Sequence, residues 1–272
     1  MKTLVQISDL HFGAVIENVL ADLTVSINEL RPDLLIVSGD LTQRAKSEQF
    51  KQAADYLAQF SMPKIIVPGN HDIPLYNVFD RFVHPLEKYI RYITDEMMPV
   101  FIDEEIAVVG LNTARSLTIK DGRLNEKQIS EAAEILRNAP ASATKIVVTH
   151  HPLDALPEFE DDLAENAEKA LIELSDAGAD LFLSGHLHMG KMTHVHTTKT
   201  SKMDKKVLMV QAGTACSTRS RNEINSFNVL YVSQNKIEAI EMTHSLESGF
   251  VRGEMQTYVK SGDDWQSEQP TP

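Results

Sequence analysis

The chain has 272 residues, a formal net charge of −13 and 42% hydrophobic residues. This composition is typical of a soluble globular protein, and the length suits one large α/β domain or two small ones. The negative charge argues against binding to long nucleic acid, because such binding depends on Lys and Arg neutralising phosphates. No apolar run approaches the roughly 18 residues of a membrane span, so we expect no membrane partner.

The single cysteine, Cys216, excludes an internal disulfide and favours a reducing compartment. We expect Cys216 to be a small buried side chain rather than a nucleophile. The first residues carry one lysine and an apolar stretch that is too short for a secretory signal. These features together predict a cytoplasmic protein.

Short runs rich in Ile, Val and Leu recur along the first two thirds of the chain. They lack clean alternation, which is typical of strands that are buried on both faces. We predict strands at 3–8, 33–38, 64–68, 106–111, 145–149 and 180–184. Apolar residues at helical spacing predict helices at about 16–30, 50–60, 126–138 and 162–177. Alternating strands and helices indicate a largely parallel sheet.

Two of these helices carry end signals. Asn125 with Gln128 three residues later predicts a capped start, and Gly178 fits the position just after a helix. From about residue 191 the pattern changes to strand-like segments that are separated by short polar turns, which favours antiparallel pairing. We expect one domain over residues 1–260, in which 191–260 completes a second sheet. Residues 261–272 read as a polar tail that Trp265 could anchor.

Polar side chains gather where five of the predicted strands end. They are Asp9 and His11, Asp40, Asn70 and His71, His150, and His186 and His188. In open α/β sheets, ligands bind at the carboxyl ends of the strands. Any one of these residues alone would more simply be a helix cap or a satisfied histidine. All of them together would leave repelling carboxylates and desolvated imidazoles, and a metal centre removes that conflict.

The donor types restrict the metal. Histidine, aspartate and one amide without a thiolate suit Mn, Fe, Zn or Ni. Seven ligands are too many for one tetrahedral ion, but they suit two divalent ions that share one carboxylate. Two such ions and two aspartates leave a positive site that could hold one phosphate.

The motifs "SDLH", "SGDLT", "PGNHD", "THHP" and "SGHLH", in this order, resemble the signature of the calcineurin-like metallophosphoesterases. Within that superfamily the chain is similar to the bacterial class III cyclic-nucleotide phosphodiesterases and their glycerophosphodiesterase relatives. The resemblance implies an α/β fold, described also as an α+β sandwich, with two central mixed sheets flanked by helices. It implies that one ion is bound by Asp9, His11 and His188. The other would be bound by Asn70, His150 and His186, and Asp40 would bridge the two.

The resemblance also implies a mechanism, in which a metal-activated hydroxide attacks phosphorus and His71 acts at the leaving-group oxygen, as general acid or as hydrogen-bond donor. Asp40 and His71 are therefore the predicted catalytic residues, and Asn70 and His71 are expected to touch substrate. Weaker candidates for substrate contact are His151, Arg44, Arg219 and Arg221. Residues 73–105 carry several aromatic side chains, and these read either as a lid beside the metals or as the core of the insert itself.

We therefore predict a phosphodiesterase that hydrolyses a small phosphodiester, either a cyclic nucleotide or a glycerophosphodiester. A phosphomonoesterase or a nucleotide-linked pyrophosphatase would use the same metal centre, so both stay open as alternatives. A protein of another class, a partner-binding module without catalysis, would be expected to have damaged ligands, and this sequence has all seven together with His71. Assembly into a homo-oligomer is also open.

Overall fold

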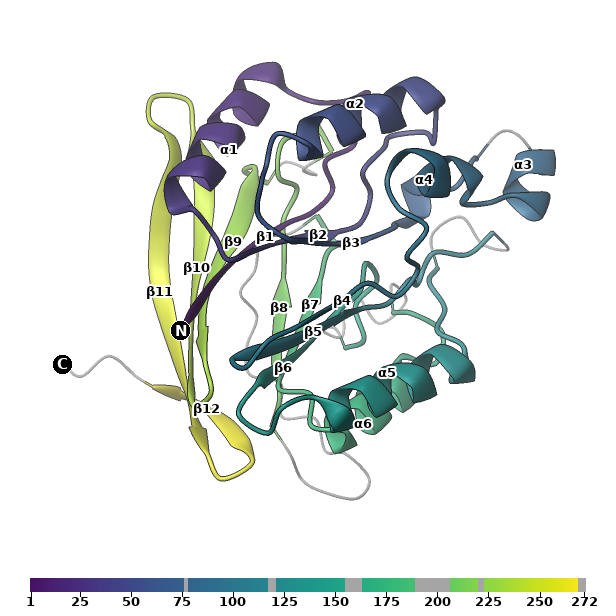
Figure 1. Ribbon diagram of the computed structural model, residues 1–272. Helices are drawn as coiled ribbons and strands as arrows, with labels where there is room; N and C mark the ends of the chain where they lie inside the picture. Colours follow the sequence, from purple (N-terminus) through teal and green to yellow (C-terminus); the bar gives the residue numbers. More distant parts are fainter. Residues whose placement is uncertain (76–77, 117–120, 155–162, 189–205, 220–222, 269–272) are drawn as a thin grey trace.

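The computed structural model describes residues 1–75, 78–116, 121–154, 163–188, 206–219 and 223–268. Two β-sheets lie face to face within these residues, and helices cover their outer faces (Figure 1). This arrangement confirms the expected class of two central sheets flanked by helices. No helix in the described ranges is both long and apolar enough to cross a membrane.

Among the described residues the larger sheet has seven strands in the order β12-β11-β10-β9-β1-β2-β3. In chain order their bounds are β1 Lys2–Ile7, β2 Leu34–Ser38, β3 Lys64–Val67, β9 Ser226–Ser233, β10 Lys236–Ser245, β11 Gly249–Ser261 and β12 Asp264–Glu268. Strands β1, β2 and β3 pair in parallel, while β9 pairs antiparallel with β1. The carboxyl ends of β1 to β3 therefore meet at one edge.

The smaller sheet has the order β4-β5-β6-β7-β8 within the described part of the chain. The bounds are β4 Val100–Ile102, β5 Ile106–Gly110, β6 Thr144–Val148, β7 Leu181–Ser184 and β8 Leu208–Gln211. Strands β5 to β8 are parallel, and only β4 runs antiparallel to its neighbour. The carboxyl ends of β6 and β7 consequently point in the same direction.

Helices α1 (Glu17–Leu30) and α2 (Ser47–Leu57) cover the larger sheet, and α5 (Glu126–Asn138) and α6 (Ala167–Asp176) cover the smaller one (Figure 1). In β2 the side chains alternate between two clusters. Leu34 and Ile36 pack between the sheets, whereas Leu35 and Val37 pack under the helices. This division explains why the run has no polar alternation, since both faces of the strand are buried.

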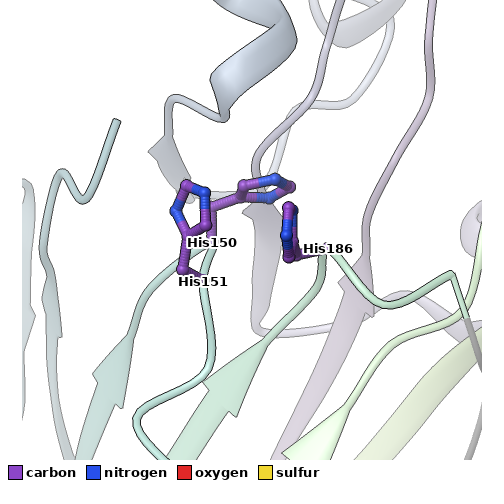
Figure 2. A group of neighbouring side chains, drawn as sticks. All are labelled: His150, His151 and His186. Carbon is purple, nitrogen blue, oxygen red and sulfur yellow. The ribbon is translucent and has the colours of Figure 1, made fainter. Parts of the chain in front are cut away.

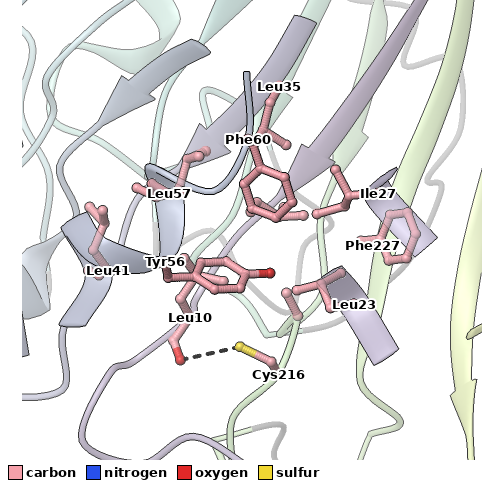
Figure 3. Packing of buried hydrophobic residues seen from close by; sticks show 14 of the residues in the cluster. Leu10, Leu23, Ile27, Leu35, Leu41, Tyr56, Leu57, Phe60, Cys216 and Phe227 are labelled. Atoms are coloured by element: carbon pink, nitrogen blue, oxygen red, sulfur yellow. Dashed lines mark hydrogen bonds between the residues drawn. The ribbon is translucent and has the colours of Figure 1, made fainter. Parts of the chain in front are cut away.

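The core beneath α1 and α2 contains Cys216 (Figure 3). Its thiol is fully buried and lies 3.7 Å from the carbonyl oxygen of Leu10. Burial raises the pKa of the Cys216 thiol, which keeps the sulfur protonated and unreactive. The expectation of a small buried side chain is confirmed.

The predicted helix signals are confirmed at two ends. Asn125 Oδ1 accepts from the Gln128 amide at 2.9 Å, and Gln128 Oε1 accepts from the Asn125 amide at 3.1 Å. This reciprocal pair is a capping box. Gly178, two residues after α6, has φ +100°, a conformation that glycine adopts readily. The structure begins α6 at Ala167, and residue 162, where the predicted helix starts, lies outside the described residues.

The C-terminal strands divide between the two sheets, and β9, β10 and β11 pair antiparallel as expected. Of the described residues within 191–260, β8 alone joins the smaller sheet, and it does so in parallel. Strands β9, β10 and β11 extend the larger sheet instead, because β9 pairs along the free edge of β1 with Leu230 opposite Leu4. Residues 191–205, including the predicted segment with His194 and His196, lie outside the described part of the chain.

The predicted polar tail is also shorter than expected. Residues 264–268 form β12, which pairs with β11. Trp265 is fully buried, and its Nε1 donates to Asp180 Oδ1 at 3.1 Å, while Lys260 Nζ lies 2.7 Å from the same oxygen. Asp180 lies directly before β7, so these contacts join the end of the larger sheet to the smaller sheet.

Residues 73–105 contain the short helices α3 (Val78–Val83) and α4 (Glu87–Tyr92) and the strand β4. Tyr89 is fully buried against Phe50 of α2, and its hydroxyl donates to the Ile66 carbonyl at 3.0 Å. This aromatic side chain therefore belongs to the main core. Phe79 and Phe82 are more than half exposed, and Tyr76 lies outside the described residues.

Candidate metal site

The seven predicted ligands come from loops that follow strands of both sheets. Asp9 and His11 follow β1, Asp40 follows β2, Asn70 follows β3, His150 follows β6, and His186 and His188 follow β7. Six of them are almost completely buried, the exception being Asn70, which is half-buried. The facing sheets thus bring residues from far apart in the sequence to one place.

Five of these residues have a left-handed backbone. The φ angles are 56° for Asp9, 47° for His11, 53° for Asp40, 74° for His186 and 58° for His188. In the described residues only three other non-glycine positions have a positive φ. Each such conformation costs roughly 1–3 kcal/mol and tends to occur at functional sites, where the surrounding structure holds it. The backbone at this site is therefore held in a less favourable conformation, which sets the orientation of these five side chains.

The glycines of the motifs allow the loops to approach closely. A Cβ on Gly69 would lie 2.1 Å from Asp40 Oδ1, and a Cβ on Gly39 would lie 2.4 Å from His150 Nδ1. Only glycine leaves room for these contacts. This explains why glycine immediately precedes Asp40 and Asn70.

Asp40 lies between two histidines. Its Oδ2 is 3.6 Å from His11 Nε2, and its Oδ1 is 3.4 Å from His150 Nε2. Asp9 Oδ1 is 3.6 Å from both His11 Nε2 and His188 Nδ1. Most of these separations are too long for good hydrogen bonds. Two ligand atoms that share one ion at about 2.1 Å lie roughly 3.0–3.5 Å apart, so the spacing suits a common cation.

Several buried polar atoms have no hydrogen-bond partner within the described residues. Four of them belong to the predicted ligands, namely Asp9 Oδ1, Asp40 Oδ2 and both ring nitrogens of His11. A buried polar atom without a partner costs about 1–3 kcal/mol. Carboxylate oxygens and an unprotonated imidazole nitrogen can donate an electron pair to a metal ion, and these atoms converge at the predicted site. The residues therefore fit the implied metal.

The surroundings of the His150 ring also fit a bound cation. Its Nδ1 lies 2.8 Å from the Ser38 carbonyl oxygen, which is an acceptor, so Nδ1 carries the proton. Nε2 faces Asn70 Oδ1 at 3.1 Å and Asp40 Oδ1 at 3.4 Å. A bare lone pair on Nε2 would repel these oxygens, so Nε2 carries either a second proton or a metal ion.

His151 also belongs to this group, and the motif pattern assigned it no ligand role. It is fully buried, its ring centre lies 4.4 Å from that of His186, and its Nδ1 lies 2.8 Å from Thr113 Oγ1 (Figure 2). The nitrogen atoms of His150, His151 and His186 are close enough to hold one ion. A second set, Asp9, His11 and His188, matches the predicted ligands of the other ion.

The charges of the site support its two aspartates as anions. Burial by itself would raise the pKa of the Asp9 carboxyl, but His188 and the other nearby histidines outweigh it and hold the pKa below its usual range. The pKa of Asp40 is lowered in the same way, against burial, chiefly by His150. Both groups thus offer carboxylate oxygens.

Asp72 plays a supporting part. Its oxygens accept from the backbone amides of Gly69, Leu41 and Thr42 at 3.0, 3.2 and 2.9 Å. It therefore ties the loop of Asn70 to the loop of Asp40 and does not contact the His71 ring. Burial and the nearby Asp40 carboxylate raise the pKa of Asp72 to about 6.

His71 is held from both sides. Its Nδ1 lies 3.0 Å from the Gln43 carbonyl oxygen, and its Nε2 lies 3.4 Å from Arg219. Burial lowers the pKa of His71, His11 and to a lesser extent Arg219 lower it further, and the Asp40 carboxylate opposes the shift. Sequence reasoning found His71 and Arg219 separately but not this contact, because no pattern links a loop after β3 to one after β8. Arg221 lies outside the described residues.

This fold and this cluster of donors define a metallophosphoesterase. Residues 2–190 match the calcineurin-like phosphoesterase family, and the chain belongs to that family of metal-dependent hydrolases. The matched range includes all seven predicted ligands.

The curated relatives include two kinds of phosphodiesterase. The cyclic AMP phosphodiesterase CpdA of Escherichia coli is 29% identical over 126 residues, which cover 45% of this chain and 42% of CpdA. The chain thus matches less than half the length of that relative. A probable glycerophosphodiester phosphodiesterase, GpdQ of Arcobacter nitrofigilis, is 24% identical over 76% of this chain and 77% of the relative.

Solved structures agree on the fold. PhoD superposes with a TM-score of 0.68 at 10% identity, covering 100% of this chain and 72% of PhoD. The purple acid phosphatase PPD1 of yellow lupin gives a TM-score of 0.65 at 11% identity, covering 94% of this chain and 53% of PPD1. At such low identity these likenesses concern the architecture alone.

Proposed function

We propose that the chain is a phosphodiesterase that requires two divalent metal ions and hydrolyses small phosphodiesters. The observation that carries this proposal is Asp40, whose two oxygens face His11 on one side and His150 on the other. Such a carboxylate suits a bridge between two ions. Asp9, His11 and His188 would hold one ion, and Asn70, His150 and His186 the other, with His151 beside the second set.

When bound, the two ions would supply an activated water and stabilise negative charge on the phosphate oxygens. The chain itself supplies the remaining parts. The buried ligand loops exclude bulk water, which strengthens the attraction between the site and an anionic substrate. His71 and Arg219 line the side where we place the leaving group. Arg219 would donate to a substrate oxygen, and His71, once protonated at Nε2, would give a proton to the leaving oxygen.

Cyclic nucleotides and glycerophosphodiesters are the first candidate substrates, because the chain is similar to relatives that are named for each of these two activities. A phosphomonoesterase or a nucleotide-linked pyrophosphatase remains the alternative, since the same ligands would serve it. Mn, Fe and Zn suit the donor set, and we keep the cytoplasmic location and a homo-oligomeric state as predictions.

The test is a substrate panel with the purified full chain, loaded in turn with Mn²⁺, Fe²⁺ and Zn²⁺. The panel contains cyclic AMP, cyclic GMP, glycerophosphodiesters, bis(4-nitrophenyl) phosphate and 4-nitrophenyl phosphate. We expect metal-dependent hydrolysis of diesters that exceeds hydrolysis of the monoester. Turnover of monoesters alone would favour the phosphomonoesterase, and bound metal without any turnover would favour a binding module.

A further inference from the structure

A small pocket, partly open to solvent, lies next to the candidate metal site. Its described lining consists of Gln43, Arg44, Asn70, His71, Ile73, Leu75 and Arg81. Asn70 and His71 belong to the site itself, so a molecule bound at the metals would extend into this pocket. The pocket lies on the side where we place the leaving group.

Two arginines give this pocket its charge. Arg44 follows β2, and its guanidinium donates to the Gln43 carbonyl oxygen at 3.2 Å. Arg81 belongs to α3 and donates to the Pro74 carbonyl oxygen at 3.1 Å, with only 7% of its surface exposed. The backbone carbonyls thus fix both guanidinium groups at the wall of the pocket, which reduces the entropy that they would lose on binding an anion.

No carboxylate is present in the described lining. Asp72 turns toward the amides of the ligand loops, and Asp80 pairs with Lys88. Arg44 and Arg81 are therefore the formally charged side chains of the described lining, on a protein whose net charge is −13. A local concentration of positive charge on an acidic protein attracts anions to that spot and not to the rest of the surface.

Because guanidinium groups bind phosphate and carboxylate groups in pairs of parallel hydrogen bonds, we propose that Arg44 and Arg81 bind a second anionic group of the substrate. This inference rests on the proposed phosphodiesterase function and narrows its substrate class. The preferred substrates are small phosphodiesters with a further phosphate or carboxylate beyond the scissile phosphate. Among the candidates of the proposed function, this ranks glycerophosphodiesters with a further carboxylate or phosphate above cyclic AMP and above diesters with a cationic group.

The experiment compares adenosine dinucleotides that differ by one phosphate. ApA has only the scissile phosphate, while pApA and ApAp add a terminal phosphate at opposite ends. We measure kcat/KM with the metal-loaded full chain for wild type, Arg81→Met, Arg44→Met and the control Arg137→Met, whose side chain is exposed on α5. Thermal unfolding checks that each variant folds. Arg44 is more exposed than Arg81, so Arg44→Met keeps the test valid if Arg81→Met is unstable.

Wild type and Arg137→Met should hydrolyse pApA or ApAp at least about tenfold better than ApA, because one charged hydrogen bond is worth about that factor. Each pocket variant should reduce this ratio toward one, and Arg81→Lys should restore part of it. A wild-type ratio near one, or an unchanged ratio in both folded variants, would overturn the proposal.

Failure of the proposed function would look different. In that case the wild type hydrolyses neither the dinucleotides nor bis(4-nitrophenyl) phosphate with any metal. The pocket is then tested without activity, by ³¹P NMR titration of inorganic pyrophosphate into chelator-treated protein. Weaker binding by Arg81→Met and Arg44→Met than by Arg137→Met would support an anion site. Equal binding by all of them would overturn it.

Discussion

Arg219 and His71 are in contact, with a guanidinium nitrogen 3.4 Å from His71 Nε2. Since Nδ1 of the ring faces the Gln43 carbonyl oxygen, it carries the proton, and Nε2 of the neutral ring accepts from Arg219. The neutral ring therefore has no proton to give at Nε2. A general-acid role requires the doubly protonated ring, and Arg219 opposes that form.

This contact predicts a pH effect. The pKa of His71 is lowered chiefly by burial, with smaller contributions from His11 and, least, from Arg219, so kcat/KM should fall as pH rises through a value below 6.5. Arg219→Met removes one cause of the lowering, raises the pKa and moves this limb of the profile to higher pH. The check is a pH profile of kcat/KM on bis(4-nitrophenyl) phosphate, with Arg137→Met as control. An unmoved limb would mean that Arg219 does not lower the pKa of the titrating group.

His71 and His188 should differ when each is replaced by alanine. His71→Ala should keep its metals but lose about 10²- to 10⁴-fold in kcat, because this residue acts on the leaving group. His188→Ala should lose metal as well, since its ring adjoins Asp9 and is held by Thr214 at 2.9 Å. Metal analysis of the purified variants separates the two cases. Loss of metal from His71→Ala would show that its role was misassigned.

Metal binding should stabilise the fold through Asp40. The orphaned oxygen Asp40 Oδ2 gains a partner only when a cation is bound. Saturating Mn²⁺ should raise the melting temperature of chelator-treated wild type by about 5 °C or more. Asp40→Asn should lose most of this rise because it removes the proposed bridge. Differential scanning fluorimetry with and without metal measures both, and an equal rise in the two proteins would contradict the bridging role.

The C-terminal strand should contribute strongly to stability. Trp265→Ala removes a fully buried indole and its hydrogen bond to Asp180, and should lower the free energy of unfolding by about 3–5 kcal/mol. Gln266→Ala, at the exposed neighbouring position, should change it by less than about 0.5 kcal/mol. Urea unfolding of metal-free protein provides the comparison. Similar midpoints for both variants would show that β12 is only loosely attached.

The sequence predicted those features of the fold and the site that depend on residue type, strand direction or residues a few positions apart. Residues in β1, β2 and β6 are apolar on both faces, so their strand character could be predicted from composition alone. The convergence of Asp9, Asp40 and Asn70 followed from the rule that parallel strands of one sheet end at the same edge, whereas His150 comes from the other sheet. The capping box of Asn125 likewise depends on residues three positions apart.

The missed features depend on distant partners. Whether β9 pairs with β1 or joins the other sheet is decided by the free edge beside Leu4, which no property of β9 itself encodes. The contacts that hold the site histidines come partly from backbone carbonyls, such as those of Ser38 and Gln43. Any residue type has a carbonyl, so a pattern of side chains cannot reveal which ones are used.

The backbone amide of His186 donates to Asp9 Oδ2 at 3.2 Å, across 177 positions of sequence. A ribosome therefore makes Asp9, Asp40 and Asn70 long before the last histidines leave the exit tunnel. In the proposed two-ion site, the early ligands alone would complete neither set, so metal loading would follow the synthesis of residue 188. A chain that stalls before that point would have an incomplete metal site, and such a site would compete poorly for scarce metal in the cell.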